Sequence, residues 1–597
     1  MNCYQENIKI LKDKEPELVE KLEKIPFTSD SCSILDNCFT ENSSSLKNCD
    51  VIVIFGFSSI NNLEKITRQI PKKALILIID HDLQNFKNSL VLYDYKNIFS
   101  SERISLAIDE KPIIATRVRM EKYFEVITVK EITIIDSYNN RSNPSYYQEI
   151  RNCLQESLMQ AQQNIATMSE FASLWDNNIL ENINHMLLNP GLNSLRNSFH
   201  NFPAIIVSAG PSLDKNVSLL VKAKNKSLII CVDTALKTLL ANNITPDIVV
   251  SIDPKEDNFM HYENAILEEI TLIAESGVCP KIFSLFTNKT IFITSYGHPL
   301  VLWIESIIGQ KGIFPVGGSV ATTAFCIANT LGNNPIIFIG QDLSFSKDGI
   351  YSKNTSYFKC WMDSINKFNT LEMTMRNYLQ EYNLIHVKGN YEDNVLTSHL
   401  MSSWIKWFGY QFKHSQSLCI NATEGGAKIE NCLIMSLNEA LNTYCHKTQN
   451  SKDILQNIHQ KHNVPDIDNF IKEMEKISND YLLANYIACQ AIETIKLLDN
   501  NPSLENHISQ REIHLLQRIN MLYKDLSSIE NILRISRWHI EPLLSKLNSI
   551  NNDSVASQIK IYKIFFQEIL KISQTIENQF SKAIKKLNNF RQYSKIS

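Results

Sequence analysis

The sequence is poor in glycine, with 16 in 597 residues, so glycines that occur close together carry more information than usual. Neither sign of charge is in large excess: the chain has 59 Lys and Arg and 63 Asp and Glu, which gives a formal net charge of −4. Nucleic-acid binding requires a basic surface, so nucleic acid is not expected as the main partner. The 13 cysteines contain no Cys-x-x-Cys pair and no Cys/His cluster at zinc spacing, which argues against a zinc site.

Long apolar runs are also missing from the chain. No stretch approaches about 18 uninterrupted apolar residues, so no membrane span is expected. The N-terminus, Met-Asn-Cys-Tyr-Gln-Glu, lacks the apolar segment of a signal peptide. Because the scattered cysteines fit a reducing compartment, these features together predict a cytoplasmic protein.

The composition is that of a globular protein with several cores, since 44% of the residues are hydrophobic and 20% are charged. The C-terminal quarter lacks glycine, and its apolar residues recur three and four apart, which predicts helices. Its expected role beyond structure is to hold a partner. The expected parts are an N-terminal α/β domain at 1–145, a helical linker at 146–200, a core α/β domain at 201–445 and an all-helical domain at 446–597.

Apolar runs in the N-terminal part predict four strands, at 51–55, 74–79, 112–116 and 124–128. The first is followed by Gly56-Phe57-Ser58-Ser59, at the end of a strand where α/β folds bind ligands. This turn has one glycine where nucleotide-binding turns use two or three, so a structural role is favoured.

The segment from Phe202 to Asp214 is the most informative in the chain. An apolar run at 204–207 predicts a buried strand, which breaks into Ser208-Ala209-Gly210-Pro211-Ser212. Gly210 permits a sharp turn and Pro211 suits a helix start. The two serine hydroxyls are expected beside free backbone N–H groups, which together predict an anion site. An ordinary strand-to-helix turn is the alternative.

Further strand-like runs at 228–232, 248–252, 291–294 and 335–339 alternate with helical segments. This order predicts a mostly parallel sheet with helices on both faces. Three of these strands end in Asp233-Thr234, Asp253-Pro254 and Gly340-Gln341-Asp342. Because ligands bind beyond the carboxyl ends of parallel strands, these residues are expected to share one edge with the 208–212 turn. Taken singly, each aspartate is more often a helix cap.

Two more loops contain clustered small residues. The segment 315–324 includes Gly317-Gly318-Ser319 and opens a helix, so it could contact a phosphate or a sugar, or could serve close helix packing. The segment 421–429 includes Glu424-Gly425-Gly426, which indicates a constrained backbone. Glu424 could orient a hydroxyl or act as a base, and a structural turn is the alternative.

His261 and His298 lie near polar loops of the core, and each is more often a packed histidine than a base. No Ser/His/Asp order indicates a hydrolase, and no carboxylate–histidine cluster has metal-ligand spacing.

The core loops together resemble the motility accessory factor family, bacterial transferases that glycosylate flagellin. The resemblance spans about residues 200–445. It rests on five motifs in order: Ser208-Ala209-Gly210-Pro211-Ser212-Leu213-Asp214, Ser251-Ile252-Asp253-Pro254, Gly317-Gly318-Ser319-Val320-Ala321, Gly340-Gln341-Asp342-Leu343 and Asn421-Ala422-Thr423-Glu424-Gly425-Gly426-Ala427.

The resemblance implies a Rossmann-like, sialyltransferase-like core between the N-terminal α/β domain and the helical C-terminal domain. It implies transfer of a nonulosonic acid, pseudaminic or legionaminic, from its CMP-activated form to Ser or Thr of flagellin, in support of flagellum assembly and motility. No resident cofactor and no metal are expected, with a divalent ion at Asp253 as an alternative. The residues expected to bind the donor are Ser208, Ala209, Gly210, Pro211, Ser212, Asp233, Thr234, Gly318, Ser319 and Gln341, and the candidates for the base are Asp253, Asp342 and Glu424.

Two other functions stay open. The same core is similar to archaeal pterin diphosphokinases, which move pyrophosphate from ATP to a hydroxymethylpterin. A non-catalytic factor that binds flagellin or polysaccharide is the third possibility. The long additions at both ends of the core favour a protein acceptor over a small-molecule kinase.

Overall fold

The computed structural model describes residues 2–27, 51–57, 60–70, 74–112, 114–119, 132–136, 143–313, 317–346, 349–499, 509–548 and 554–594. The chain divides into two compact units, Met1–Phe171 with Trp538–Asn551, and Ala172–Arg537 with Asn552–Ser597. Helix α7 (Pro144–Glu181) carries the chain from the first unit into the second. The strand predicted at 124–128 and the residues Ser58, Ser59 and Pro315 lie outside the described part.

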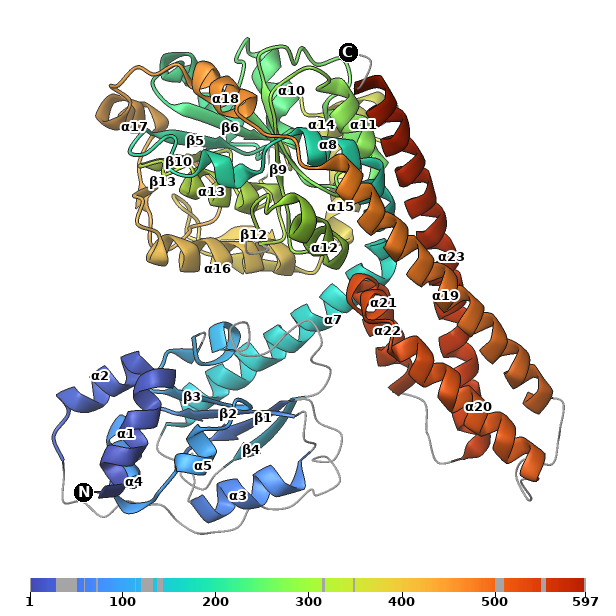
Figure 1. The fold of residues 1–597 in the computed structure, drawn as a ribbon. Helices are drawn as coiled ribbons and strands as arrows, with labels where there is room; N and C mark the ends of the chain where they lie inside the picture. Colours follow the sequence, from blue (N-terminus) through green and yellow to red (C-terminus); the bar gives the residue numbers. More distant parts are fainter. Residues whose placement is uncertain are drawn as a thin grey trace. The chain divides into compact units, whose positions relative to one another are not determined.

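The first unit is built on a parallel four-stranded sheet in the order β3-β2-β1-β4 (Figure 1). Neighbouring β1 residues serve different cores, because side chains alternate along a strand. Ile52 and Ile54 join one cluster with Leu11 and Leu22, and Val53 joins a second cluster with residues of α7. The elements are α1 (Asn2–Lys14), α2 (Pro16–Lys24), β1 (Val51–Phe55), α3 (Ile60–Gln69), β2 (Leu75–Asp80), α4 (Leu83–Leu92), α5 (Lys96–Phe99), β3 (Ile104–Ile108) and β4 (Ile132–Asp136).

The strands predicted at 51–55 and 74–79 are confirmed as β1 and β2, whereas β3 and β4 were not predicted. The prediction of a strand at 112–116 is wrong, because Ile114–Val118 forms a π-helical turn. Thr116 Oγ1 donates to the carbonyl of Pro112 at 2.7 Å, a bond to the residue four positions back that is typical of helices. Proline is well tolerated at a helix start, so the apolar run was compatible with either structure.

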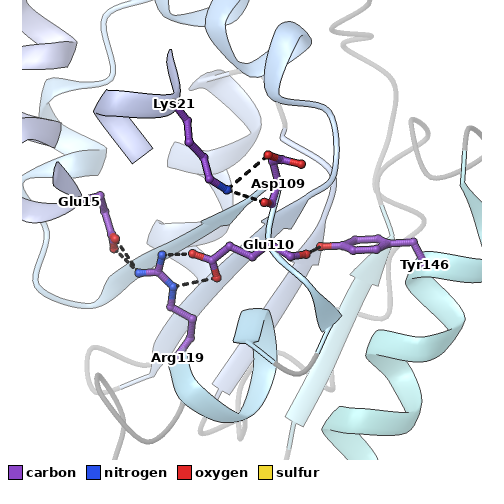
Figure 2. A network of polar contacts seen from close by, with 6 residues as sticks. All are labelled: Glu15, Lys21, Asp109, Glu110, Arg119 and Tyr146. Carbon is purple, nitrogen blue, oxygen red and sulfur yellow. Dashed lines mark hydrogen bonds and ion pairs between the residues drawn. The ribbon is translucent and has the colours of Figure 1, made fainter. Parts of the chain in front are cut away.

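A buried ion triad joins distant segments of the first unit (Figure 2). Arg119 Nη1 donates to both carboxylate oxygens of Glu15 at 2.6 Å, and Arg119 Nε donates to Glu110 at 3.1 Å. Tyr146 of α7 donates to the carbonyl oxygen of Glu110 at 2.8 Å. The guanidinium therefore ties the junction of α1 and α2 to the loop that follows β3.

The second unit contains an all-parallel eight-stranded sheet in the order β14-β13-β10-β5-β6-β7-β8-β9. The predicted α/β class is confirmed. After β5 the chain adds β6 to β9 on one side, and it then returns to place β10 and β13 on the other. The strand order thus reverses between β5 and β10, which is where open α/β sheets bind ligands. The strands are β5 (Ala204–Val207), β6 (Leu228–Val232), β7 (Ile248–Ser251), β8 (Thr271–Glu275), β9 (Ile291–Thr294), β10 (Ile336–Ile339), β13 (Cys419–Asn421) and β14 (Leu433–Ile434).

Helices cover both faces of this sheet (Figure 1). Between β10 and β13 the chain makes an insertion of three helices and a β-hairpin, which begins shortly after Asp342. The helices used below are α8 (Ile183–Leu188), α9 (Leu213–Asn216), α10 (Asp233–Ala241), α12 (Pro299–Ile308), α13 (Val320–Thr330), α14 (Ser356–Ser364), α15 (Leu371–Gln380) and α16 (His399–His414), and the hairpin is β11 (Leu384–Val387) with β12 (Val395–Ser398).

The region after β14 is helical, as predicted. Helices α19 and α23 pack side by side (Figure 1), and Trp303 of α12 packs against Phe470 and Phe580, with ring centroids 6.1 and 5.8 Å apart. In the described part of the chain, no helix combines the length and apolar character that a membrane crossing requires. These helices are α17 (Leu437–Tyr444), α18 (Ser451–Gln460), α19 (Ile467–Asp499), α20 (Gln510–Ser527), α21 (Glu530–Ile535), α22 (Arg537–Asn548) and α23 (Val555–Ser594).

Candidate functional site

The turns that follow β5 and β10 lie against each other at the reversal of strand order. Ser208 Oγ donates to Gln341 Oε1 at 2.6 Å, although the two residues are 133 positions apart. The N–H of Gly210 donates to the carbonyl of Gly340 at 2.8 Å. A Cβ on Gly210 would lie 2.0 Å from Asp342 Oδ2, so this close contact requires glycine. The sheet thus brings together two of the predicted segments.

Asp342 is the buried acid of this contact, with 5% of its surface exposed. Its Oδ2 accepts a hydrogen bond from Ser212 Oγ at 2.6 Å, and its Oδ1 accepts one from the N–H of Ser212 at 3.3 Å. Burial raises the pKa of Asp342 to about 6, although the bonds from Ser212 and the charge of Lys215 act in the opposite direction. In the free protein Asp342 therefore holds the turn after β5 in place.

The third predicted loop, 421–429, packs on the same acid. The N–H of Ala427 donates to the carbonyl of Asp342 at 2.7 Å, and a Cβ on Gly426 would lie 2.4 Å from that carbonyl oxygen. Gly426 has φ 74° and Glu424 has φ 58°, which confirms the expected constrained backbone. Glu424 Oε1 accepts hydrogen bonds from the N–H of Leu437 at 3.0 Å and from Asn216 Nδ2 at 3.3 Å.

The expectation of free N–H groups in the turn after β5 is wrong for four residues of this segment. The N–H groups of Gly210, Ser212, Leu213 and Asp214 all donate within the fold, to Gly340, Asp342, Gly210 and Pro211 respectively. The segment after β10 supplies the acceptors for Gly210 and Ser212, and the turn itself supplies those for Leu213 and Asp214. In addition, α9 has only four residues, so it adds little helix dipole.

Sequence reasoning missed two polar residues directly after the turn. Lys215 is exposed, and its Nζ donates to the carbonyl of Glu424 at 3.2 Å. Asn216 is buried and donates to the carbonyl of Ala422 at 3.1 Å. Lys215 places a positive charge where the three loops meet, and its position three residues after Ser212 was the only signal for it in the sequence.

The ends of β6 and β7 place two more predicted residues along the same edge. Asp233 is buried, and its oxygens accept from the N–H of Thr234 and from Asn258 Nδ2, both at 2.8 Å. Asp253 is half-buried, and its Oδ1 accepts from the N–H of Lys255 at 2.9 Å. Among the described residues, none donates to Asp253 Oδ2. Burial raises the pKa of Asp253, which makes its carboxylate a stronger base.

The small-residue turn at Gly317–Ser319 starts α13. Ser319 caps this helix, and its Oγ accepts from the N–H of Thr322 at 3.2 Å. Because α13 leads the chain back to the start of β10, its N-terminus lies at the carboxyl edge of the sheet. Gly318 is exposed there with φ 80°. Among the described residues, no hydrogen bond joins this turn to the loops around Asp342.

The described residues contain no group of three or more His, Cys, Asp or Glu side chains that could hold a metal ion. Along the carboxyl edge of the sheet, beginning where the strand order reverses, the described residues form a site. It contains the exposed ammonium of Lys215, the hydroxyls of Ser208 and Ser212, and the half-buried carboxylate of Asp253 at the end of β7.

The chain is similar to known proteins in its core and over most of its length. Residues 177–348 match the family described as "6-hydroxymethylpterin diphosphokinase MptE-like", which confirms the expected similarity to pterin diphosphokinases in the core. A solved structure, the MAf glycosyltransferase from Magnetospirillum magneticum AMB-1, aligns over 98% of this chain and 95% of its own, with 13% identity and a TM-score of 0.48.

Three uncharacterized proteins of Treponema pallidum (strain Nichols) are similar in sequence. They are 31% identical over 120 residues (17% of this chain), 25% over 237 residues (35%) and 26% over 121 residues (20%). The matches span 29%, 39% and 56% of those relatives' own lengths.

The raised pKa of Asp342 predicts a pH-dependent effect of Asp342→Asn on stability. The native state holds the Asp342 proton up to about pH 6, whereas the unfolded chain loses it near 3.8. The wild type therefore loses stability as pH rises through this window, by roughly 3 kcal/mol. The asparagine side chain carries no charge at any pH, so the variant does not lose this stability. We expect Asp342→Asn to unfold at a higher urea midpoint than the wild type at pH 8, and we expect this difference in midpoint to disappear below pH 4.

Asp247→Asn is the matched control for this experiment. Burial also raises the pKa of Asp247 to about 6, but Asp247 accepts from the N–H of Ile229 at the opposite edge of the sheet. Both variants should show the pH trend, and only Asp342→Asn should alter ligand binding. A stability gap for Asp342→Asn that stays constant from pH 4 to 8 would contradict the prediction.

Proposed function

We propose that the protein is a glycosyltransferase that moves a nonulosonic acid from its CMP-activated donor to a Ser or Thr hydroxyl of flagellin. The proposal rests on one observation: the turn 208–212 and the loop 421–429 both contact Asp342 where the strand order of the parallel sheet reverses. Those segments are also the ones that resemble the motility accessory factor family.

In this proposal Lys215 supplies the positive charge that the CMP phosphate needs. Ser208 and Ser212 line the same turn, and each has one hydroxyl proton, which it donates to Gln341 or Asp342 in the free protein and would turn to the phosphate when the donor binds. Asp342 fixes the turn and is a positioning residue. As the bond from the anomeric carbon to the phosphate breaks, its electron pair leaves with CMP, and negative charge develops on the phosphate beside Lys215.

Asp253 is the candidate base that we favour. Asp342 uses both carboxylate oxygens on Ser212, whereas Asp253 and Glu424 each keep one oxygen without a donor among the described residues. Burial raises the pKa of Asp253, which makes its carboxylate the stronger base that this role needs. In the proposed step the acceptor oxygen bonds to the anomeric carbon, and its proton passes to Asp253.

A pyrophosphoryl transferase that uses ATP is the second candidate, and the family match over residues 177–348 favours it. In that case Asp342, the buried acid next to the turn after β5, would hold a divalent cation that neutralises the charge of the ATP phosphates. The two functions differ in nucleotide, metal requirement and acceptor.

Nucleotide binding separates these candidates. We expect isothermal titration calorimetry of the purified protein to show tighter binding of CMP than of ATP with Mg²⁺, and Ser212→Ala to weaken CMP binding on the order of tenfold, as for loss of one hydrogen bond to a charged group. Tight binding of ATP–Mg²⁺ with none of CMP would overturn the glycosyltransferase in favour of the kinase.

The mass of intact flagellin provides the test in the cell. Deleting the gene should leave flagellin made but lighter by the mass of its glycan, and the wild-type gene should restore the mass. Complementation with Ser212→Ala or Asp253→Ala should fail to restore it. An unchanged flagellin mass after deletion would contradict the proposed acceptor.

A further inference from the structure

His261 follows the β7 end of the candidate site and is buried without partners. Its side chain is 1% exposed, and among the described residues neither Nδ1 nor Nε2 has a hydrogen-bond partner. Burial lowers the pKa of His261, so the ring is neutral near pH 7, with one nitrogen as donor and the other as acceptor. Leaving both unsatisfied costs free energy in the free protein.

The surroundings of this ring belong to the site. Asp233 and Asp253, which end β6 and β7, are both close enough to His261 to act on its charge. Neighbouring strands are about 4.8 Å apart, so the end of β7 lies about 10 Å from the turn after β5. A single nucleotide-sized ligand can span that distance.

Tyr357, at the start of α14, covers His261. The two rings meet edge to face with centroids 5.2 Å apart, and Tyr357 stacks on Tyr351 at 4.9 Å. Tyr357 is 37% exposed, and no described residue hydrogen-bonds its hydroxyl. Its ring can therefore turn aside without breaking a hydrogen bond to a described residue.

The segment that carries Tyr357 is anchored on the proposed donor turn. The N–H of Ser352 donates to the carbonyl of Ala209 at 2.9 Å, and the N–H of Lys353 donates to Asp214 Oδ1 at 3.0 Å. Ser356 Oγ donates to the carbonyl of Met260, next to His261, at 2.9 Å. These bonds hold Tyr357 between the turn after β5 and the loop after β7.

Resting on the proposed function, we propose that His261 and Tyr357 form a subsite for two hydroxyl groups of a sugar-bearing ligand, one on each side of the imidazole, which opens when Tyr357 turns away. The bound ligand then gives the two ring nitrogens the partners that they lack in the free protein. His261 is a ligand-binding residue in this scheme, beside the proposed base Asp253.

The hydrogen-bonding pattern selects the ligand class. A neutral imidazole needs one acceptor and one donor, and a hydroxyl supplies either. A phosphate or carboxylate only accepts, so it would leave one nitrogen unpaired. The half-exposed faces of Tyr351 and Tyr357 add an apolar surface of the kind that binding sites place beside a few polar groups. Hydroxyls occur in two parts of the proposed donor, the ribose of the nucleotide and the transferred sugar.

His261→Phe tests the subsite because phenylalanine keeps the ring contact with Tyr357 and removes both nitrogens. Replacing unpaired polar atoms by carbon should leave the thermal midpoint of the free protein unchanged or raised. Calorimetry should show binding weakened on the order of tenfold for the hydroxyl-bearing ligand, the value for about one hydrogen bond. The probes are CMP, its 2′,3′-dideoxy analogue and CMP-N-acetylneuraminic acid.

The probes distinguish the two sources of hydroxyls. Weaker binding of CMP with unchanged binding of the dideoxy analogue assigns the subsite to ribose, whereas weaker binding of CMP-N-acetylneuraminic acid alone assigns it to the transferred sugar. Equal affinities of wild type and His261→Phe for all three probes would overturn the subsite. Failure of the wild type to bind any of them would instead refute the proposed function.

His459→Phe is the matched control. His459 is also packed against an aromatic ring, Phe292 at 5.9 Å, but its Nε2 has a partner in Asn189 Oδ1 at 2.9 Å. This variant should lose stability and keep its ligand affinity, which is the opposite of the pattern expected for His261→Phe. A lower thermal midpoint for His261→Phe with unchanged affinity would show that the ring is only structural.

Discussion

Gly426→Ala should collapse the site and lower the free energy of unfolding of the second unit by about 3 kcal/mol, the sum of typical costs for overpacking and for a left-handed backbone in a residue with a side chain. The added Cβ would lie 2.4 Å from the carbonyl oxygen of Asp342 and 2.5 Å from its Cα. Both are backbone atoms at the end of β10, which cannot turn aside as a flexible side chain can. Gly426 also has φ 74°.

The loop has to move as a whole to relieve this clash. The hydrogen bonds nearest the clash run from the N–H of Ala427 to the carbonyl of Asp342 at 2.7 Å and from the N–H of Asn390 to the carbonyl of Gly426 at 2.9 Å. Moving the loop breaks the hydrogen bond from Lys215 Nζ to the carbonyl of Glu424 and the one from the N–H of Ala427 to the carbonyl of Asp342. Binding of CMP, measured by calorimetry, should therefore fall below detection together with the loss of stability.

The neighbouring glycine supplies the control. A Cβ on Gly425 would meet Ser212 Cβ at 3.4 Å and Lys215 Nζ at 3.7 Å, which are ordinary contacts. Gly425→Ala should therefore change the urea midpoint little. If Gly425→Ala and Gly426→Ala destabilise the protein equally, the cost lies in general loop rigidity and not in the contact with Asp342.

Strands buried on both faces were the most predictable part of the fold. The runs at 204–207 and 228–232 coincide with β5 and β6, because a short apolar run between polar turns is compatible with few other structures in a parallel sheet. β8 was missed since Thr271–Glu275 begins and ends with polar residues. β14 is only two residues long and exposed, so no apolar pattern in the sequence predicts it.

The candidate site could be predicted in its parts but not in its contacts. The ends of β5, β6, β7 and β10 were visible in the sequence, and the carboxyl ends of parallel strands share an edge. The bond between Ser212 and Asp342, 130 positions apart, depends on β10 lying next to β5, and strand order is set by the packing of the whole sheet. The wrong prediction of free N–H groups has the same origin, since Gly340 supplies the acceptor that occupies Gly210.

The insertion after β10 was the least predictable part of the region around the site. No helix or strand was predicted for the segment that carries Tyr351 and Tyr357, although Tyr357 lies at the start of α14. Their place beside the turn after β5 comes from backbone hydrogen bonds to Ala209 and Asp214, which no side-chain pattern encodes. His261 was interpreted as a packed histidine, and only the structure reveals that its ring nitrogens lack partners among the described residues.

Arg119→Met should destabilise the first unit by about 3–5 kcal/mol, the usual cost of leaving buried charges without their partner. The guanidinium bonds both oxygens of Glu15 and also Glu110, and all three side chains are at most 15% exposed (Figure 2). Methionine fills a similar volume, so the loss measures the electrostatic role of Arg119 and not a cavity. Urea unfolding followed by hydrogen exchange of β1 and β2 amides would report on this unit.

Two further variants separate the triad from ordinary surface pairing. Lys21 pairs with Asp109 at 3.3 Å, but these side chains are 41% and 52% exposed, so Lys21→Met should cost no more than about 1 kcal/mol. Combining Arg119→Met with Glu15→Gln and Glu110→Gln removes the unpaired charges and should recover most of the lost stability. A triple variant as unstable as Arg119→Met alone would show that packing, and not buried charge, makes Arg119 necessary.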